Sequence, residues 1–238
     1  MNGAHLTLNG EGLLADPAGA LYWPARRLLA VADLHLEKGS GFAARGNALL
    51  PPYDSRATLA ALARLVRHYD PKTVVSLGDS FHDGGAPARL VAADAAALKR
   101  LTGAVDWVWA AGNHDPAPPE GFGGRVVEEL VLDRLRFRHE AAAETLASGE
   151  VSGHYHPKAL VQTRGRRIGG RCFATDGRRL VLPSFGAYTG GLDVLDPALT
   201  ALFGPALKIL LLRRGRIYAF GRRQLVPPPE PYRLAAGD

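Results

Sequence analysis

Hydrophobic and polar residues in the first half of the chain form short blocks that indicate alternating strands and helices. Continuous apolar runs are typical of buried strands, and three of them occur at residues 28–32, 73–77 and 107–111. Between the first two runs, apolar residues at helical spacing predict a helix that Ser55 caps and that extends to Tyr69. An Ala-rich segment from Val91 to Leu101 predicts a second helix. This order of elements predicts sheet layers covered by helices.

The second half of the chain changes to a series of short strands. The expected strands lie at 125–127, 130–138, 150–152, 160–163, 171–174, 180–182, 207–212 and 216–220. A hairpin turn at Arg214–Gly215 joins the last two. We therefore predict an α/β (α+β) fold, a two-layered mixed β-sheet sandwich flanked by helices. Residues 1–226 are expected to form one domain, followed by an extended Pro-rich tail at 227–238.

The positive charge of the chain is concentrated in its last third. The net charge is +6, and residues 161–238 carry 13 Lys and Arg against 5 Asp and Glu, whereas residues 1–160 carry 16 against 18. Contact with a polyanion such as DNA would explain this excess. An Ala-, Arg- and Gly-rich composition would explain it equally well, so charge alone does not choose a partner.

The sequence has no feature that indicates secretion or a membrane. Its apolar runs are shorter than the roughly 20 residues that span a bilayer, and its first residues lack the pattern of a signal peptide. The single cysteine, Cys172, cannot form an internal disulfide and suits a reducing compartment. We expect a cytoplasmic protein with no membrane partner.

Residue types that bind metals follow each of the three N-terminal strands directly, in the motifs D-x-H, G-D and G-N-H-D, and a single His and a G-H-x-H motif come later. Each motif alone is also explained by a turn or a structural histidine. However, loops at the carboxyl ends of strands in an open α/β sheet gather at one crevice, so these residues can converge. The set, in chain order, is Asp33, His35, Asp79, Asn113, His139, His154 and His156.

Imidazole, carboxylate and amide oxygen are ligands that suit Mn²⁺, Fe or Zn²⁺. His139 is the weakest member of the set because its motif is a single residue. His5 and His68 compete with it, although their positions in the N-terminal stretch and at the end of a helix favour structural roles.

This series of motifs resembles the calcineurin-like metallophosphoesterase superfamily over residues 28–157. The resemblance implies two divalent metal ions, with manganese expected first and iron or zinc as alternatives. One ion would be held by Asp33, His35 and His156, the other by Asn113, His139 and His154, and Asp79 would bridge them. Such a metal pair clamps phosphate oxygens and activates a water. His114 would then protonate the leaving oxygen or stabilise the phosphate.

The segment GDSFHD places His82 where most phosphatases of that superfamily have Asp, and it resembles the nuclease branch instead. His82 is therefore a second catalytic residue by resemblance, and a helix-start residue without a catalytic part is the alternative. Asp83 and Asp115 are expected to orient the histidines from behind.

A narrower resemblance covers nearly the whole chain. The segments ADLHLEKGSGFAARGNALLPPYD, SGHYHPKA and LPSFGAYTGGLDVLDP are similar to the bacterial ligase-associated DNA damage response endonuclease family. This resemblance implies a DNA substrate, a role in DNA repair, and a DNA ligase and a helicase-like protein as partners. The Gly-rich stretch 185–191 either packs beside the site or lets a substrate approach its backbone.

Three functions remain open at this point. The first is a DNA endonuclease or phosphodiesterase, favoured by His82, by the basic last third and by the resemblance. The second is a phosphodiesterase or phosphatase for nucleotides or cyclic phosphates with the same metals. The third is a scaffold without activity, which the complete set of ligand residues and His114 argue against.

Overall fold

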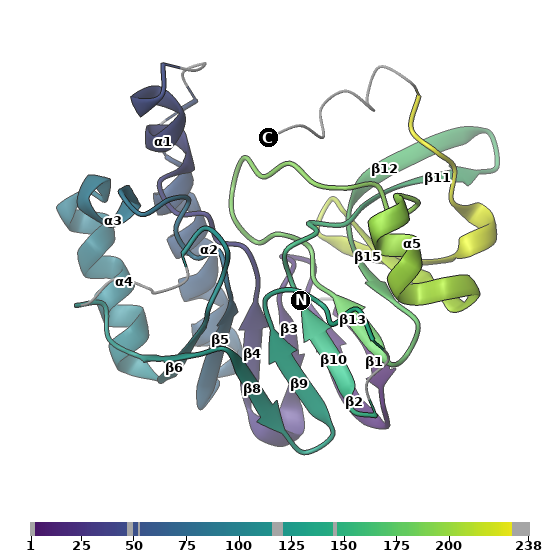
Figure 1. The fold of residues 1–238 in the computed structure, drawn as a ribbon, viewed down its shortest axis with the longest axis horizontal. Coiled ribbons are helices and arrows are strands. Elements are labelled where there is room, and N and C mark those ends of the chain that lie inside the picture. The colour runs from purple at the N-terminus through teal and green to yellow at the C-terminus, as the bar shows by residue number, and fades with distance from the viewer. Residues whose placement is uncertain (1–2, 47–49, 52, 116–120, 145–146, 230–238) are drawn as a thin grey trace.

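Two β-sheets form the middle of the molecule (Figure 1), and the computed structural model describes residues 3–46, 50–51, 53–115, 121–144 and 147–229. The strands of the first sheet follow the order of the sequence. They are β1 (Ala4–Leu8), β2 (Glu11–Ala15), β3 (Leu21–Trp23), β4 (Leu28–Val31), β5 (Thr73–Leu77), β6 (Asp106–Ala110) and β7 (Arg125–Val127). The first four pair antiparallel, and β4 to β7 pair parallel.

The second sheet is mixed and contains the remaining strands. They are β8 (Glu129–Leu132), β9 (Leu135–Arg138), β10 (Gly149–Ser152), β11 (Lys158–Thr163), β12 (Arg166–Thr175), β13 (Arg179–Val181), β14 (Lys208–Arg213) and β15 (Arg216–Gly221). Their spatial order is β15-β14-β12-β13-β10-β9-β8, and β11 pairs with β12 beside this path. Strand β10 runs parallel to both β9 and β13.

Helices cover the outer faces of the two sheets. The α-helices are α1 (Lys38–Ala44), α2 (Asp54–Tyr69), α3 (Ala86–Arg89), α4 (Ala92–Ala104) and α5 (Pro197–Phe203), and the 3₁₀ turns are η1 (Pro24–Arg26), η2 (Gly204–Ala206) and η3 (Arg222–Gln224). Figure 1 shows α2 and α4 beside the first sheet and α5 beside the second. None of the helices in the described residues is long and apolar enough to cross a membrane.

Three hydrophobic cores hold these layers together. The core between the sheets joins Trp23 of the first sheet to Phe137 of the second, with ring centroids 6.1 Å apart. A second core packs Leu62 of α2 onto the outer face of the first sheet, and a third packs Leu199 of α5 onto the second sheet. Burial of each such large side chain contributes about 1.5–3 kcal/mol. Strands β4 and β5 are buried on both faces because each face meets one of these cores.

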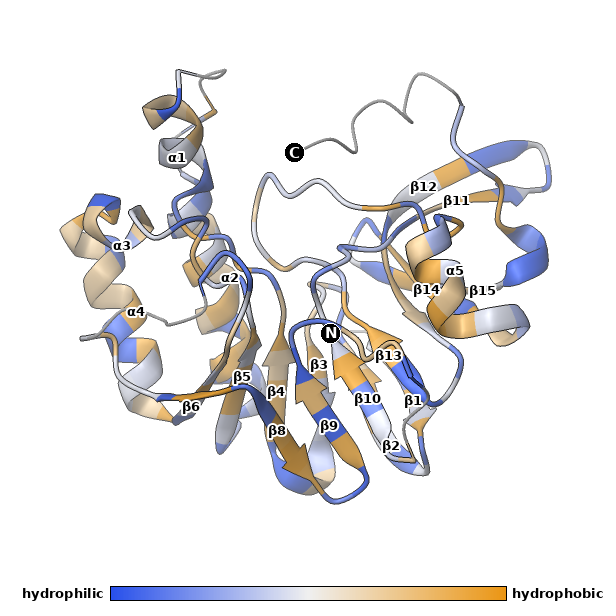
Figure 2. Cartoon of the chain, viewed as in Figure 1, coloured by the Kyte–Doolittle hydropathy of each residue, from blue (hydrophilic) through white to orange (hydrophobic). Residues whose placement is uncertain are grey.

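The hydropathy of the chain follows the layers. Figure 2 shows hydrophobic residues on strands β4 and β13, and hydrophilic residues at the tip of the hairpin between β11 and β12. The predicted two-layered mixed sandwich flanked by helices is confirmed.

Several predicted elements change in detail. The expected strand 130–138 is a hairpin, because Asp133 adopts a positive φ and turns the chain between β8 and β9. Ser55 does not cap α2, which begins at Asp54. Its hydroxyl instead donates a hydrogen bond to Glu37 Oε1 (2.8 Å) and accepts one from the Glu37 backbone N–H (2.8 Å). The predicted hairpin at Arg214–Gly215 is confirmed.

Strands β1, β2 and β3, helices α1, α3 and α5 and the 3₁₀ turns were not predicted. The hairpin of β1 and β2 turns at Asn9–Gly10, both with positive φ, and Asn-Gly is a strong sequence signal for such a turn. Helix α5 begins after Asp196, whose carboxylate accepts a hydrogen bond from the backbone N–H of Ala198. Of the expected tail, residues 230–238 lie outside the described residues.

Candidate metal centre

The loops after β4 and β5 lie side by side and continue the pairing of their strands. The backbone N–H of His35 donates to Asp79 O (2.9 Å), that of Leu36 to Ser80 O (2.9 Å), and that of His82 to Leu36 O (3.0 Å). These bonds bring the D-x-H motif next to the G-D motif. Convergence at the carboxyl ends of the parallel strands, expected from the sequence, is therefore present in the first sheet.

The second sheet brings its histidines to the same edge of the sandwich. His139 follows β9 and His154 follows β10, and the backbone N–H of Gly153 donates to His139 O (2.9 Å). The backbone N–H of His154 then donates across to both carboxylate oxygens of Asp33 (3.1 Å each). A buried carboxylate of one sheet thus fixes the loop of the other.

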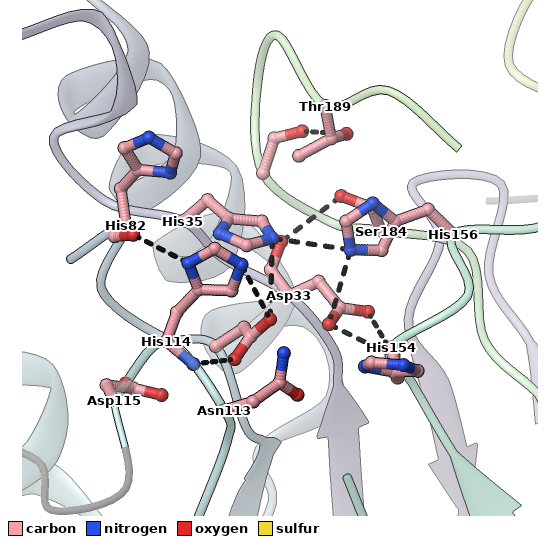
Figure 3. A network of polar contacts seen from close by, with 12 residues as sticks. Asp33, His35, His82, Asn113, His114, Asp115, His154, His156, Ser184 and Thr189 are labelled. Atoms are coloured by element: carbon pink, nitrogen blue, oxygen red, sulfur yellow. Dashed lines mark hydrogen bonds and ion pairs between the residues drawn. The ribbon is translucent and has the colours of Figure 1, made fainter. Parts of the chain in front are cut away.

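The side chains gather into two groups, each with ligand atoms within 4.8 Å of one another. In the first group, His156 Nε2 lies 3.3 Å from His35 Nε2 and 3.4 Å from Asp33 Oδ1. Figure 3 shows these three side chains pointing toward one another. In the second group, His139 Nε2 lies 3.2 Å from His154 Nδ1 and 3.5 Å from Asp79 Oδ1.

Asp79 lies between the two groups. Its Oδ2 is 3.9 Å from His35 Nε2, and its Oδ1 is 3.5 Å from His139 Nε2, so one oxygen faces each group. Asn113 joins the second group through Oδ1, 2.7 Å from His139 Nε2. The structure therefore brings together all seven residues that the motifs singled out. His5 and His68, the competitors of His139, are exposed on β1 and α2.

The chemistry of these groups fits divalent metal ions. Burial, then the charges of His156 and Lys38, lower the pKa of His35 to about 2, and burial followed by His139 lowers the pKa of His154. Neutral imidazoles offer lone pairs to a metal at neutral pH. Nitrogen and oxygen donors without a thiolate suit Mn²⁺, Fe or Zn²⁺.

Comparison with known proteins agrees with this arrangement. The family model of the calcineurin-like phosphoesterases matches residues 26–189. The chain belongs to this family. Membership makes it a hydrolase of phosphate esters, and together with the two groups it indicates a divalent-metal site.

Solved structures similar to this phosphoesterase include the nuclease MPE of Pseudomonas putida, with 28% sequence identity and a TM-score of 0.71. That match covers 92% of this chain and 100% of the nuclease. Yfce, a phosphoesterase from E. coli, is 16% identical with a TM-score of 0.42, over 82% of this chain and 98% of Yfce. No curated protein matches the chain.

Motif glycines make room for the candidate ligands of this phosphoesterase. A Cβ on Gly112 would lie 2.2 Å from Asp79 N, and one on Gly78 would lie 2.4 Å from His139 Nδ1. Contacts that short do not occur in folded proteins, so any larger residue would displace a candidate ligand. The glycines of the G-D and G-N-H-D motifs are thus required because candidate ligands from other motifs pack directly against them.

Five of the seven candidate ligands adopt the left-handed backbone conformation that favours glycine. They are Asp33 (φ 55°), His35 (φ 41°), Asp79 (φ 46°), His154 (φ 70°) and His156 (φ 46°). This conformation costs roughly 1–2 kcal/mol for a residue with a side chain. Strain of this kind concentrates at functional sites, where the surrounding structure enforces it.

His114 lies at the mouth of the site, with 45% of its side chain exposed. Its Nδ1 is 3.0 Å from the carbonyl oxygen of His82, and because a carbonyl only accepts, Nδ1 carries the proton. Its Nε2 therefore points into the site, 3.9 Å from Asp79 Oδ2. The backbone N–H of His114 donates to Asp79 Oδ1 (3.0 Å), which fixes the ring beside the metal groups.

His82 stacks on His114, with centroids 5.8 Å apart and planes at 17°. Its Nε2 lies 2.6 Å from the guanidinium of Arg45. Burial, then the charges of Lys38 and Arg45, lower the pKa of His82 to about 4. Sequence reasoning missed Arg45, whose position just after α1 has no motif to mark it.

The two acidic residues predicted to orient histidines have other contacts. Asp115 Oδ2 accepts the backbone N–H groups of Ser80 (2.9 Å) and Phe81 (3.0 Å), so it fixes the loop that carries Asp79. Burial raises its pKa to about 7. Asp83 instead binds Arg89 with both oxygens (2.8 and 2.9 Å). Asp115 therefore positions the backbone of the loop that carries Asp79, and Asp83 positions α3 through Arg89.

The Gly-rich stretch 185–191 packs against the first loop of the site. The backbone N–H of Gly186 donates to Asp33 O (3.1 Å), and a Cβ at this position would lie 2.0 Å from Leu34 O. Ser184, which the motifs did not single out, also donates to Asp33 O (3.2 Å). This close packing supports the explanation that the stretch packs beside the site.

Proposed function

We propose that this phosphoesterase is a binuclear metal-dependent phosphodiesterase that cleaves DNA as an endonuclease. The observation that carries the proposal is the placement of Asp79 between two groups of ligand residues, one facing each carboxylate oxygen. The likeness to a nuclease over 92% of the chain supports the choice of DNA. The His82–His114 pair, as in the nuclease branch, supports it too.

Asp33, His35 and His156 would hold one metal ion, Asn113, His139 and His154 the other, and Asp79 both. Bound there, two divalent ions supply Lewis-acid stabilisation of phosphate oxygens and a water activated for attack. Manganese is the first choice for the native metal, with iron or zinc as alternatives.

The contribution of His114 follows from its hydrogen bonds. Since the His82 carbonyl fixes the proton on Nδ1, a protonated His114 carries its second proton on Nε2. That proton faces the site and can pass to the oxygen of the departing sugar, which otherwise leaves as a costly alkoxide. The stacked ring of His82 holds His114 in this orientation.

The role in DNA repair, the cytoplasmic location and the partnership with a DNA ligase and a helicase-like protein remain part of the proposal. The repair role and the partners rest on the narrower resemblance of the sequence, and the location rests on the absence of a signal-peptide pattern and on the single cysteine. The excess of Arg in residues 161–238 is consistent with a nucleic-acid substrate.

A matrix of metals and substrates tests the proposal. Purified protein would be incubated with Mn²⁺, Fe²⁺, Zn²⁺ or Mg²⁺ and with bis-nitrophenyl phosphate, nitrophenyl phosphate, nucleotides and cyclic nucleotides, single-stranded DNA or supercoiled plasmid. We expect hydrolysis of the diester and nicking of the plasmid, both strongest with Mn²⁺, and loss of nicking in His114→Ala. Turnover of nucleotides without cleavage of either DNA would replace the proposal by the small-molecule alternative.

A further inference from the structure

A hollow of about 490 Å³ opens directly beside the second ligand group. Its wall is formed by the loop after β9, the G-H-x-H motif, the segment before α5 and α5 itself. The lining includes Glu140, His154, Tyr155, Leu192, Ala198 and Leu202. A substrate whose phosphate lies at the metal groups would therefore have its adjoining chemical group next to this hollow.

The wall of the hollow is built on the hydrophobic core. Tyr155, Leu192 and Leu202 are partly buried and pack against the core beneath α5. The ring of Tyr155 stands edge-on to His154, with centroids 4.9 Å apart and planes at 85°. Packing on both sides fixes the ring, which gives the hollow an aromatic face of defined orientation.

The charge of the hollow excludes a phosphate and favours a neutral group. Glu140 is the one charged residue in the described lining, and its Oε1 lies 3.9 Å from His154 Nε2. Two cations lie instead at the two ends of α1: Lys38 Nζ is 5.8 Å and the guanidinium carbon of Arg45, just after the helix, 5.7 Å from the ring centroid of Phe42. An anionic chain is drawn to α1, and an uncharged ring to the hollow.

We propose that the hollow binds the nucleobase of a nucleotide that adjoins the cleaved phosphodiester. The base contacts the Tyr155 ring and the leucine side chains, and its N–H groups donate to the Glu140 carboxylate. The next phosphates of the strand then run toward Lys38 and Arg45. This inference rests on the proposed phosphodiesterase function, and it assigns Tyr155, the residue between the two histidines of the G-H-x-H motif, to substrate binding.

Three dinucleotides test the inference: thymidylyl-thymidine and its two analogues in which one thymine, on the 5′ or the 3′ side, is replaced by hydrogen. We expect wild-type protein to cleave the full dinucleotide with a kcat/KM about tenfold above that of one of the two abasic analogues, because contact with an aromatic side chain stabilises a base by this order. Equal kcat/KM for all three would overturn the inference.

A matched pair of variants tests whether the preference for the full dinucleotide arises in the hollow. Ala198→Trp places a large ring in the hollow from α5, and Ala206→Trp makes the same exchange at an exposed residue of η2 outside the hollow lining. Ala198→Trp should reduce the ratio of full to abasic dinucleotide to about one, whereas Ala206→Trp should keep the wild-type ratio. An unchanged ratio in Ala198→Trp overturns the inference.

The same experiment separates this inference from the proposed function. Cleavage of all dinucleotides at one rate leaves the phosphodiesterase proposal standing and removes the nucleobase site. Hydrolysis of nitrophenyl phosphate without cleavage of any dinucleotide or DNA removes the phosphodiesterase proposal, and the nucleobase site falls with it.

Discussion

The two sheets contribute chemically unlike halves of the candidate metal centre. The first sheet supplies both carboxylates and the amide, with one histidine, whereas the second supplies three histidines. Each ligand group combines both sheets: Asp33 and His35 with His156, and Asp79 with His139 and His154. Neither sheet by itself holds a complete group.

This division couples metal binding to the packing of the sandwich. Two buried carboxylates lie close together on one sheet, and neutral imidazoles lie opposite them. A divalent ion between them would offset the carboxylate charge and connect the sheets at the same time. Metal affinity and the stability of the interface between the sheets should therefore change together.

The largest effect is expected from Asp79→Ala, because one carboxylate oxygen of Asp79 faces each group. Phosphodiesterase kcat should fall by about 10³-fold or more, and both ions should be lost or weakened. The measurements are kinetics with bis-nitrophenyl phosphate and metal content by mass spectrometry. Asp106→Ala is the control and should retain activity, because Asp106 begins β6 and the candidate ligands follow the carboxyl ends of the strands. Full metal content in Asp79→Ala would refute its bridging position.

Replacing a histidine of the first sheet and one of the second should impair activity in different ways. His114→Ala should lower kcat for DNA by about 10²–10³-fold and bis-nitrophenyl phosphate much less, because a nitrophenolate leaves without a proton. Metal content should stay intact. His156→Ala, from the second sheet, should lower metal content and both activities together. Equal losses on both substrates in His114→Ala would show that it is not the proton donor.

Metal addition should stabilise the sandwich. At a concentration of about 100 times Kd, a single Mn²⁺ site raises the free energy of unfolding by about 2.7 kcal/mol, and for this chain length each kcal/mol raises Tm by about 2–4 °C. Thermal unfolding after chelation and after Mn²⁺ addition measures this shift. The shift should shrink in His156→Ala. If Tm is the same with and without metal while ions are bound, the sheets are not coupled through the site.

The smallest effect concerns backbone strain. In metal-free protein, His35→Gly should be more stable than His35→Ala by about 1 kcal/mol, because His35 has φ 41° and glycine adopts this conformation without cost. At His139, which is not among the residues with positive φ, the order should reverse. Denaturant unfolding of the four variants provides the comparison, and the same order at both positions would contradict it.

The sequence predicted the parallel strands of the first sheet closely but missed its antiparallel strands β1, β2 and β3. Strands β4, β5 and β6 are long apolar runs because both of their faces are buried, so their positions were predicted within one residue. The strand expected at 130–138 hides a turn at Asp133, and such a turn has no glycine or proline to mark it. The helix α5 follows a run that resembles a loop, since its only clear signal is the capping Asp196.

The residues of the candidate site could also be predicted from local sequence patterns. Its seven residues follow strands or stand in short motifs, and those motifs are local in sequence. Arg45 and Glu140 have no local pattern, so their places beside His82 and His154 follow only from the packing of distant segments. The hollow at Tyr155 likewise depends on α5, which approaches the motif only after the chain has folded.

The sequence by itself determined which residue types stand at the ends of the strands, and through them the family and the chemistry of metals and phosphate esters. Periodicity and short motifs carry that information because strand ends and turns are set by neighbours along the chain. The tertiary structure alone decided which atoms meet. One oxygen of Asp79 faces a histidine of the first sheet, and the other oxygen faces a histidine of the second sheet. An apolar hollow lies on one side of the site and cations lie on the other. These relations arise only when the two sheets pack together.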